Sequence, residues 1–503
     1  MTLARVMSAA LLAAGIGSCG VPDAALARGR SATVTRQTDA QTDPMSLCVG
    51  IDIPSETRIA ACSRQLNTEP LSETDIANLT AHRAVAFLQH GDATRAMLDA
   101  EEAIRHNDAD PLALYTRGFV QMQKGETDKA IADLSRSLTV SPDVPRTLVA
   151  LCRAYGIKSD FKAALSDCDR AVTLDTDHAS VYVTRADVRR SAGDQAGAIS
   201  DYTQALRIDP RNVYSLAARG DLYLGGAELE KAMKDFNAAI AIDPMRADTF
   251  VSRSLVWRSK GRHIEALEDT DTALRLAPRN FQALNNRCFF NWERGHFEEA
   301  LEDCNAAMAI NAKPARVHAN RALVNAALGH GEAALEDAEI ALARDPRSVT
   351  ALEARADAHL KLGQTDLALA DLTTISEINP NDARIWYVRG VAYISLGLPE
   401  KAIADFGRAI ALDPNNVEAR VHRAKMLVKQ GSLDKALEDY DVALGLEPDN
   451  VVARTSRAFV YEVRKDLKRA RSDYTAAAHA IAHSHEERMA QDFARSKLSE
   501  TTN

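Results

Sequence analysis

Alanine recurs every 34 residues through most of this 503-residue chain. When the first residue of a repeating unit is placed at Ala77, position 20 of twelve consecutive units is alanine, with no insertion or deletion between them. These alanines are Ala96, Ala130, Ala164, Ala198, Ala232, Ala266, Ala300, Ala334, Ala368, Ala402, Ala436 and Ala470. A period of this length indicates an array of small supersecondary units. One unit cannot bury a core alone, so neighbouring units must stack to supply it.

Each unit contains two stretches with helical periodicity, separated by a turn, and eight of the twelve units have a proline after the second stretch. Position 8 is always small, and position 27 is alanine in ten of the twelve units, which lets helices approach closely. The turn glycines near position 15 are Gly125, Gly193, Gly261, Gly295, Gly363, Gly397 and Gly431. The prolines at position 32 are Pro142, Pro210, Pro244, Pro278, Pro346, Pro380, Pro414 and Pro448. Glycine suits the left-handed end of a first helix, and proline stops a second.

This combination resembles the tetratricopeptide repeat (TPR), which has the same period, the same small positions and the same proline. The resemblance covers residues 77–484. It implies an all-α fold, an α-solenoid that winds into a right-handed TPR superhelix of about twelve helix-turn-helix repeats. In this family the first helix of each repeat, helix A, lines a concave groove, and the second is helix B.

Two positions depart from the common TPR pattern. Position 7 is arginine in eleven repeats, and position 23 is aspartate in all twelve. A hairpin that turns near position 16 brings these positions to about the same level, so we expect a ladder of Arg–Asp pairs. The alternative is two independently solvated charges. Repeat three has Leu151 at position 7, so pairing within repeats would leave Asp167 without its arginine, whereas pairing between repeats would not.

Residues 1–18 have the pattern of a lipoprotein-type signal peptide. Arg5 precedes an apolar stretch that is too short to span a bilayer and that ends in Ile16-Gly17-Ser18-Cys19. This resembles a bacterial lipobox, in which Cys19 is lipidated and becomes the new N-terminus. No acidic residue follows Cys19, and by the same resemblance this implies the outer membrane. The alternative is a soluble periplasmic protein released by cleavage after Ala27, at an A-x-A site.

The seven cysteines fit an oxidising compartment. Two pairs occupy positions 8 and 24 of repeats three and seven, which face each other across a hairpin within disulfide reach. A third pair lies before the repeats, and Cys19 remains unpaired. The predicted disulfides are Cys48–Cys62, Cys152–Cys168 and Cys288–Cys304. The alternative is that these are small buried thiols.

The segments on either side of the repeats are predicted to be a tether and two caps. Residues 19–76 comprise a polar tether and an N-terminal cap, with a helix over Ser55–Leu66 that is capped at Ser55. Residues 485–503 form a C-terminal capping helix. Its Met489 and Phe493 lie four residues apart, and we expect them to cover the apolar face of the last repeat.

The sequence contains none of the common motifs for catalysis or for a cofactor. It has no Walker A loop, no G-x-G-x-x-G, no H-E-x-x-H, no C-x-x-C and no G-x-S-x-G. We therefore expect no enzyme, no cofactor and no metal. The alternative is a metal-dependent enzyme that uses the His-rich end around His479 and His483. The net charge of −9 disfavours nucleic acid, because phosphate binding needs a basic face.

Binding to proteins or peptides is the function that remains. In TPR proteins, positions 2, 5, 9, 12 and 13 of helix A face the groove, and we call these positions the groove face. Aromatic residues make up only 5% of the chain, so those on the groove face are candidate anchors for a partner. They include Tyr115, Phe119, Phe289, Trp292 and Tyr387. The alternative is that they pack between adjacent A helices.

These features together predict a non-catalytic interaction scaffold of the bacterial cell envelope, attached to the membrane only by a lipid. Its partners would be proteins or peptides held in the groove. The lysine and asparagine pattern by which some TPR domains clamp chaperone C-termini is absent, so no known peptide specificity carries over. A soluble cytoplasmic TPR adaptor is the second interpretation, and it predicts reduced cysteines and an uncleaved N-terminus.

Overall fold

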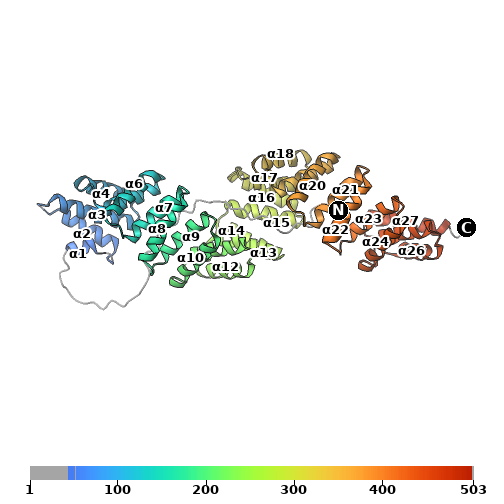
Figure 1. Cartoon of the computed structure of the whole chain (residues 1–503), viewed down its shortest axis with the longest axis horizontal. Coiled ribbons are helices and arrows are strands. Elements are labelled where there is room, and N and C mark those ends of the chain that lie inside the picture. Colours follow the sequence, from blue (N-terminus) through green and yellow to red (C-terminus); the bar gives the residue numbers. More distant parts are fainter. Residues whose placement is uncertain (1–43, 51, 69, 501–503) are drawn as a thin grey trace. The chain divides into compact units, whose positions relative to one another are not determined.

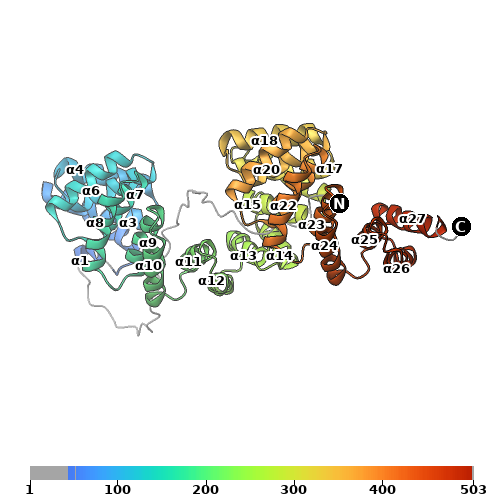
Figure 2. The ribbon, with the colours of Figure 1, turned by 45° about the vertical axis from the view of Figure 1, so that its right-hand side comes forward.

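The computed structural model describes residues 44–50, 52–68 and 70–500, and the chain is all-α within these ranges (Figures 1 and 2). It contains twenty-seven helices there and no strand. Twelve helix-turn-helix pairs, from α3 and α4 to α25 and α26, correspond to the twelve repeats, so the predicted solenoid of helical hairpins is confirmed. The chain divides into two compact units, an N-terminal unit that ends at Val256 and a C-terminal unit that begins at Trp257.

In the N-terminal unit, two leader helices precede the repeats, whose A helices have odd numbers and whose B helices have even numbers. The helices are α1 (Pro44–Val49), α2 (Ser55–Leu66), α3 (Glu73–Gln89), α4 (Ala93–His106), α5 (Pro111–Gln123), α6 (Thr127–Val140), α7 (Pro145–Ile157), α8 (Phe161–Leu174), α9 (Ala179–Ser191), α10 (Gln195–Ile208), α11 (Val213–Gly225) and α12 (Leu229–Ile242). The boundary between the units falls inside α13 (Ala247–Ser259).

The C-terminal unit continues the same alternation and ends on a single helix. Its helices are α14 (His263–Leu276), α15 (Phe281–Glu293), α16 (Phe297–Ile310), α17 (Ala315–Leu328), α18 (Gly331–Arg344), α19 (Val349–Lys361), α20 (Thr365–Ile378), α21 (Ala383–Ser395), α22 (Pro399–Leu412), α23 (Val417–Lys429), α24 (Leu433–Leu446), α25 (Val451–Val463), α26 (Leu467–His479) and α27 (His485–Glu500).

Positions 8 and 24 face each other inside each hairpin, and their sizes are matched. Where position 24 is aromatic, position 8 is alanine or glycine. In repeat five, a Cβ added to Gly220 would lie 2.7 Å from Cε1 of Phe236. In repeat ten, a Cβ added to Gly390 would lie 2.7 Å from Cε1 of Phe406. These distances are well below the optimal separation of two carbon atoms. The aromatic ring at position 24 therefore occupies the space that a side chain at position 8 would need.

The turn between helices A and B requires a left-handed residue at position 15. Nine repeats have a glycine there, with φ between 69° and 85°. The other three have Ser159, Ala227 and Lys465, with φ of 61°, 58° and 62°. Residues with a Cβ adopt the left-handed conformation at a cost in free energy. The geometry of the turn therefore overrides the backbone preference of these three residues.

The leader hairpin of α1 and α2 covers the start of the first repeat. Helix α2 has the predicted bounds, but its N-cap residue is Pro54 and no side chain caps it, so the capping role expected for Ser55 is wrong. Cys48 and Cys62 are fully buried and pack with Leu79 of α3. The leader thus shields apolar surface that the first repeat would otherwise expose.

Helix α27 continues the register of the repeats, because His485 lies twelve periods of 34 residues after the start of repeat one. It therefore occupies the place of a helix A. Its buried residues are Gln491 and Ala494. The expectation that Met489 and Phe493 cover the last repeat holds for Phe493, whose ring contacts that of Tyr474 in α26 edge-on, with 6.2 Å between centroids. It is wrong for Met489, which is 62% exposed, and Phe493 itself is still 42% exposed. They stand at positions 5 and 9 of this helix, which belong to the groove face.

Candidate functional site

An arginine–aspartate ladder joins the two helices of the repeats. In repeat four, Arg185 Nε donates to Asp201 Oδ2 at 2.9 Å, and Nη2 donates to Oδ1 at 2.7 Å. The same two bonds between positions 7 and 23 join Arg83–Asp99, Arg117–Asp133, Arg219–Asp235, Arg287–Asp303, Arg321–Asp337, Arg355–Asp371, Arg389–Asp405, Arg423–Asp439 and Arg457–Asp473. Bidentate pairing fixes both groups. The predicted ladder is confirmed, and its pairs lie within repeats.

The remaining guanidinium nitrogen of many ladder arginines reaches back to the preceding repeat. Arg287 Nη1 donates to Oδ1 of Asp271, at position 25 of repeat six, at 2.7 Å. Hydrogen bonds to Asp303 and then to Asp271 raise the pKa of Arg287. The same link to position 25 joins Arg185–Asp169, Arg219–Thr203, Arg253–Asn237, Arg321–Asn305 and Arg457–Asp441. Arg185, Arg219, Arg287, Arg321 and Arg457 therefore connect consecutive repeats as well as the two helices of their own repeat.

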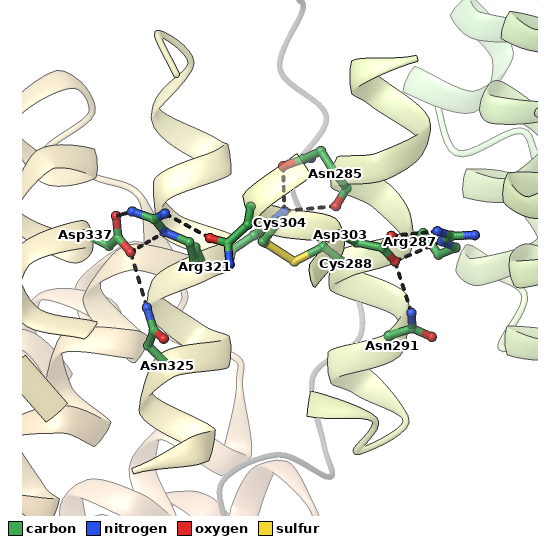
Figure 3. Close-up of a disulfide and its surroundings, with 11 residues drawn as sticks. Asn285, Arg287, Cys288, Asn291, Asp303, Cys304, Arg321, Asn325 and Asp337 are labelled. Carbon is green, nitrogen blue, oxygen red and sulfur yellow. Dashed lines mark hydrogen bonds and ion pairs between the residues drawn. A yellow bond between two sulfur atoms is a disulfide. The ribbon is translucent and has the colours of Figure 1, made fainter. Parts of the chain in front are cut away.

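Asparagines add donors to two of the buried ladder carboxylates (Figure 3). Asn291 Nδ2 donates to Asp303 Oδ2 at 3.2 Å, and Asn325 Nδ2 donates to Asp337 Oδ2 at 3.4 Å. His318 Nδ1 lies 3.0 Å from the other oxygen of Asp337. A buried charge is tolerated when it is paired and hydrogen-bonded in this way.

Repeat three interrupts the ladder. Leu151 is 5% exposed and packs in the apolar core at the position that carries arginine in the other repeats. Burial raises the pKa of Asp167 to about 6, and Arg170 lowers it only in part. The carboxylate of Asp167 is therefore partly shielded from water, but it has no arginine at position 7 to pair with.

The groove face is concave at the end of the C-terminal unit. Lys425 of α23 donates to Oε1 of Glu486 in α27 at 2.8 Å, although all of repeat twelve lies between them in sequence. The charge of Glu486 also contributes to the raised pKa of Tyr387 in α21, which reaches about 12 chiefly because the phenol is buried. Side chains two and three repeats apart approach each other in this way only where the A helices curve inward.

The five aromatic residues predicted as anchors are mostly packed against neighbours. Phe119 and Trp292 are buried, with 9% and 3% of their surface exposed. Tyr115, Phe289 and Tyr387 are half-buried. Their rings contact Phe119 at 6.0 Å, Trp292 at 5.4 Å and Phe406 at 5.9 Å, measured between centroids. The guanidinium of Arg258 covers the ring of Phe289 at 4.5 Å.

Four exposed apolar side chains occupy groove-face positions of the adjoining helices α25 and α27, at the end of the C-terminal unit. Phe459 and Val463 occupy positions 9 and 13 of α25, and Met489 and Phe493 occupy positions 5 and 9 of the adjoining α27. Their exposed fractions are 39%, 50%, 62% and 42%. We call these residues the apolar quartet. The sequence-based prediction did not include these residues as a site. Extending the 34-residue register to His485 places Met489 and Phe493 on the groove face.

Family comparison agrees with this architecture. One family model of the tetratricopeptide repeat matches residues 82–145, 183–247 and 319–383, and a second matches residues 383–416. The chain contains tetratricopeptide repeats. TPR proteins typically serve as scaffolds for protein interactions, and they generally bind protein or peptide partners.

Comparison with solved structures finds one with a similar fold and others that match parts of the chain. The APC/C hetero-tetramer Cut9–Hcn1 is 13% identical, with 81% of this chain and 93% of that chain covered and a TM-score of 0.50. A tetratricopeptide repeat protein from Parabacteroides merdae is 19% identical over 50% of this chain and 98% of that chain, with a TM-score of 0.39. MamA is 23% identical over 32% of this chain and 95% of that chain, with a TM-score of 0.31. No curated protein matches the chain.

The TPR geometry brings each predicted cysteine pair together. The Cα atoms are 4.8 Å apart in Cys48–Cys62, 5.5 Å in Cys152–Cys168 and 5.3 Å in Cys288–Cys304, which is disulfide distance. The last pair joins α15 to α16 beside the Arg287–Asp303 pair (Figure 3). All six sulfur-bearing side chains are fully buried.

One acidic side chain of the TPR groove face is deeply buried. Glu353, at position 5 of repeat nine, is 4% exposed, and its Oε1 lies 2.6 Å from Nη2 of Arg384 in the next A helix. Burial raises the pKa of Glu353 to about 7, although the charge of Arg384 opposes the rise. This pair links adjacent A helices and is covered from solvent, so it is not accessible to a ligand.

Two further points from the sequence concern the alternative of a metal site at the His-rich end and the predicted lipid anchor. Over the residues that the structure describes, no group of three or more His, Cys, Asp or Glu side chains is arranged to hold a metal ion. His479 Nδ1 instead lies 2.8 Å from the backbone oxygen of Thr475. Cys19 and Ala27 lie outside the described residues. No described helix is long and apolar enough to cross a membrane.

Proposed function

We propose that this TPR protein is a non-catalytic scaffold of the bacterial cell envelope that holds a segment of a partner protein in its groove. The observation that carries the proposal is the apolar quartet on a concave face. Four large apolar side chains on neighbouring A helices leave water when a partner covers them, and aromatic residues contribute strongly to such interfaces.

The envelope location rests on the signal-like N-terminus and on the three cysteine pairs. Disulfides persist in exported proteins and are rare in the reducing cytosol. A lipidated Cys19 would leave six cysteines for three pairs, and the segment between Cys19 and α1 would serve as the tether that sets the distance from the membrane. This arrangement supports an outer-membrane lipoprotein that faces the periplasm.

Site-specific photo-crosslinking in cells tests the binding face. We expect a photoreactive residue at Met489 or Val463 to crosslink to the same partner band, because both belong to the apolar quartet. Leu467 provides the matched control, since it is 63% exposed but lies at the start of helix B, away from the groove face. Equal crosslinking from Leu467 and Met489, or none from Met489, would contradict binding through the groove.

Intact mass of the protein from a membrane fraction tests the compartment. We expect a chain that begins at Cys19 with attached lipid, and six cysteines that react with an alkylating reagent only after reduction. A full-length mass with seven reactive thiols would refute export, lipid and disulfides together and would support a cytoplasmic adaptor. A chain that begins after Ala27 would replace the anchor with a soluble periplasmic form.

A further inference from the structure

The groove face of the first three repeats carries positive charge and no acidic residue. Its fifteen positions in α3, α5 and α7 include two arginines, Arg146 and Arg153, and neither aspartate nor glutamate. Acidic residues return only with Asp187, Asp221 and Asp248 in the following repeats. The basic character of this end is therefore local, in a chain whose net charge is −9.

A buried arginine from the leader hairpin adds to this charge. Arg58 of α2 is 3% exposed, and its guanidinium donates to the backbone oxygen of Cys48 at 3.1 Å and to Oε1 of Gln89 at 2.7 Å. Both acceptors are uncharged, whereas buried arginines usually have a carboxylate partner. Burial lowers the pKa of Arg58, and the charge of Arg146 lowers it further.

Three basic groups act on one another across the start of the groove. Arg146, at position 2 of α7, is exposed and lies over the ring of Tyr115 in α5, with 5.4 Å between its guanidinium carbon and the ring centroid. His82 is half-buried in α3, and its pKa falls to about 4 because of burial and of the charges of Arg58 and Arg146. Arg58, Arg146 and Arg153 together are called the basic cluster. His82 is neutral at pH 7 and reports the charge of its neighbours.

We propose that the basic cluster binds an acidic segment of a partner protein, whose carboxylates supply the missing counter-charges. The inference rests on the proposed scaffold function and names the chemistry of one segment that the groove accepts. Arg146 and Arg153 lie two helical turns apart on one face, about 10 Å along α7, and an extended segment covers that distance in about three residues. Arginine pairs with carboxylates in bidentate geometry.

A peptide fits this cluster better than a nucleic acid does. A nucleic acid presents a continuous row of phosphates and needs an extended basic surface. The basic cluster is confined to one end of the groove, and the groove face of repeats four to six carries Asp187, Asp221 and Asp248 beside Arg190 and Arg258. A short acidic stretch matches this local positive charge, whereas a long polyanion would find no continuous basic surface beyond repeat three.

Fluorescence anisotropy with the full chain tests the proposal. The probe is a labelled eight-residue peptide of alternating glutamate and serine, and its control has glutamine in place of glutamate. We expect the acidic peptide to bind, the glutamine peptide not to bind, and R146Q/R153Q to weaken binding about tenfold or more, because two charge-assisted contacts are lost. The matched control is Arg170→Gln, which removes a charge from helix B of the same repeat, where Arg170 pairs with Asp143 on the surface. This control should change binding less than about twofold.

The titration of His82, followed by NMR, gives an independent readout. Removal of the neighbouring cation in R146Q should raise the pKa of His82 in the free protein, and the bound acidic peptide should raise it by about one unit in the unaltered protein. If the pKa of His82 is the same in R146Q and in the peptide complex as in the free, unaltered protein, the basic cluster does not exist.

Other outcomes overturn the inference directly. These are equal affinity for the glutamine peptide, equal weakening by R170Q and R146Q/R153Q, and tighter binding of an octanucleotide than of the acidic peptide. None of these results bears on the apolar quartet, so crosslinking through Met489 would survive the failure of the acidic-segment proposal.

Discussion

Leu151 occupies the position from which an arginine would reach Asp167. Ten repeats show the bidentate pair between positions 7 and 23, and repeat three keeps the aspartate while it replaces the arginine with a buried leucine. The carboxylate of Asp167 is consequently desolvated without the compensation that its counterparts receive, and its pKa rises to about 6. The array therefore contains one ladder carboxylate that destabilises the fold at neutral pH.

Asp167→Asn is expected to stabilise the protein at neutral pH. A carboxyl whose pKa is near 6 when folded and near 3.9 when unfolded favours folding below pH 4, and this contribution is lost as the pH rises through 6. The group is partly exposed, so the gain at pH 7.5 should be about 1 kcal/mol rather than the full linkage value. Urea denaturation at pH 4 and pH 7.5 measures it, and the gain should be absent at pH 4.

Asp235→Asn provides the matched control for this prediction. Asp235 is 3% exposed and pairs with Arg219 through two hydrogen bonds. Its replacement removes a charge-assisted pair and should destabilise the protein by about 2 kcal/mol at pH 7.5. If both asparagine variants lower the stability equally, Asp167 has a compensating partner and the interpretation is wrong.

The features that could be predicted from the sequence are those whose residues recur at the same position of the repeats. Helical hairpins, the left-handed turn and the Arg–Asp ladder follow from residues that recur at fixed positions, because the same side chains meet in each repeat. The link from Arg287 to Asp271 was not predictable in this way, since position 25 varies among Asp, Asn, Thr and other residues. Eleven of the twelve residues at position 25 carry a side-chain acceptor, with Gly407 as the exception, and no single residue type reveals this shared property.

The exposed fraction of each groove-face residue was also not predictable from the sequence. Trp292 and Phe459 both occupy groove-face positions, yet the first is 3% and the second 39% exposed. Trp292 is covered by residues of the adjacent repeats, and the neighbours of Phe459 leave it open. Exposure depends on the side chains of two or three successive repeats together, so the position within one repeat does not determine it.

Ala227→Gly is expected to stabilise repeat five. Ala227 holds φ at 58° in the left-handed turn, a conformation that costs a residue with a Cβ about 1–2 kcal/mol. Glycine removes this strain but gains freedom in the unfolded chain, so the net effect should be about 0.5–1 kcal/mol. Gly193→Ala at the equivalent turn, where φ is 85°, should have the opposite sign. The urea midpoints of the two variants test this prediction. A loss of stability in both variants would show that Ala227 is not strained in the turn.

Gly220→Ala is expected to destabilise the same repeat by overpacking. The added Cβ would lie 2.7 Å from the ring of Phe236, which is itself fully buried and unable to move without disturbing its neighbours. Overpacking of this kind costs about 1–3 kcal/mol. Gly225→Ala, where nothing lies within 4 Å, is the control and should be neutral or stabilising, because alanine favours helix. Equal thermal midpoints for the two variants would mean that the hairpin relaxes around the new methyl group.

Replacing both Cys288 and Cys304 with alanine tests whether this pair is oxidised in the folded protein. Repeat eight already has alanine at both positions, Ala322 and Ala338, so the variant recreates a pairing that the fold accepts. Loss of a cross-link that spans 16 residues should cost about 3 kcal/mol under oxidising conditions. A reductant should then lower the stability of the unaltered protein and leave only the smaller difference between buried thiols and methyl groups. If the unaltered protein and the variant differ by the same amount with and without reductant, the pair is a set of buried thiols, and the case for an oxidising compartment is weakened.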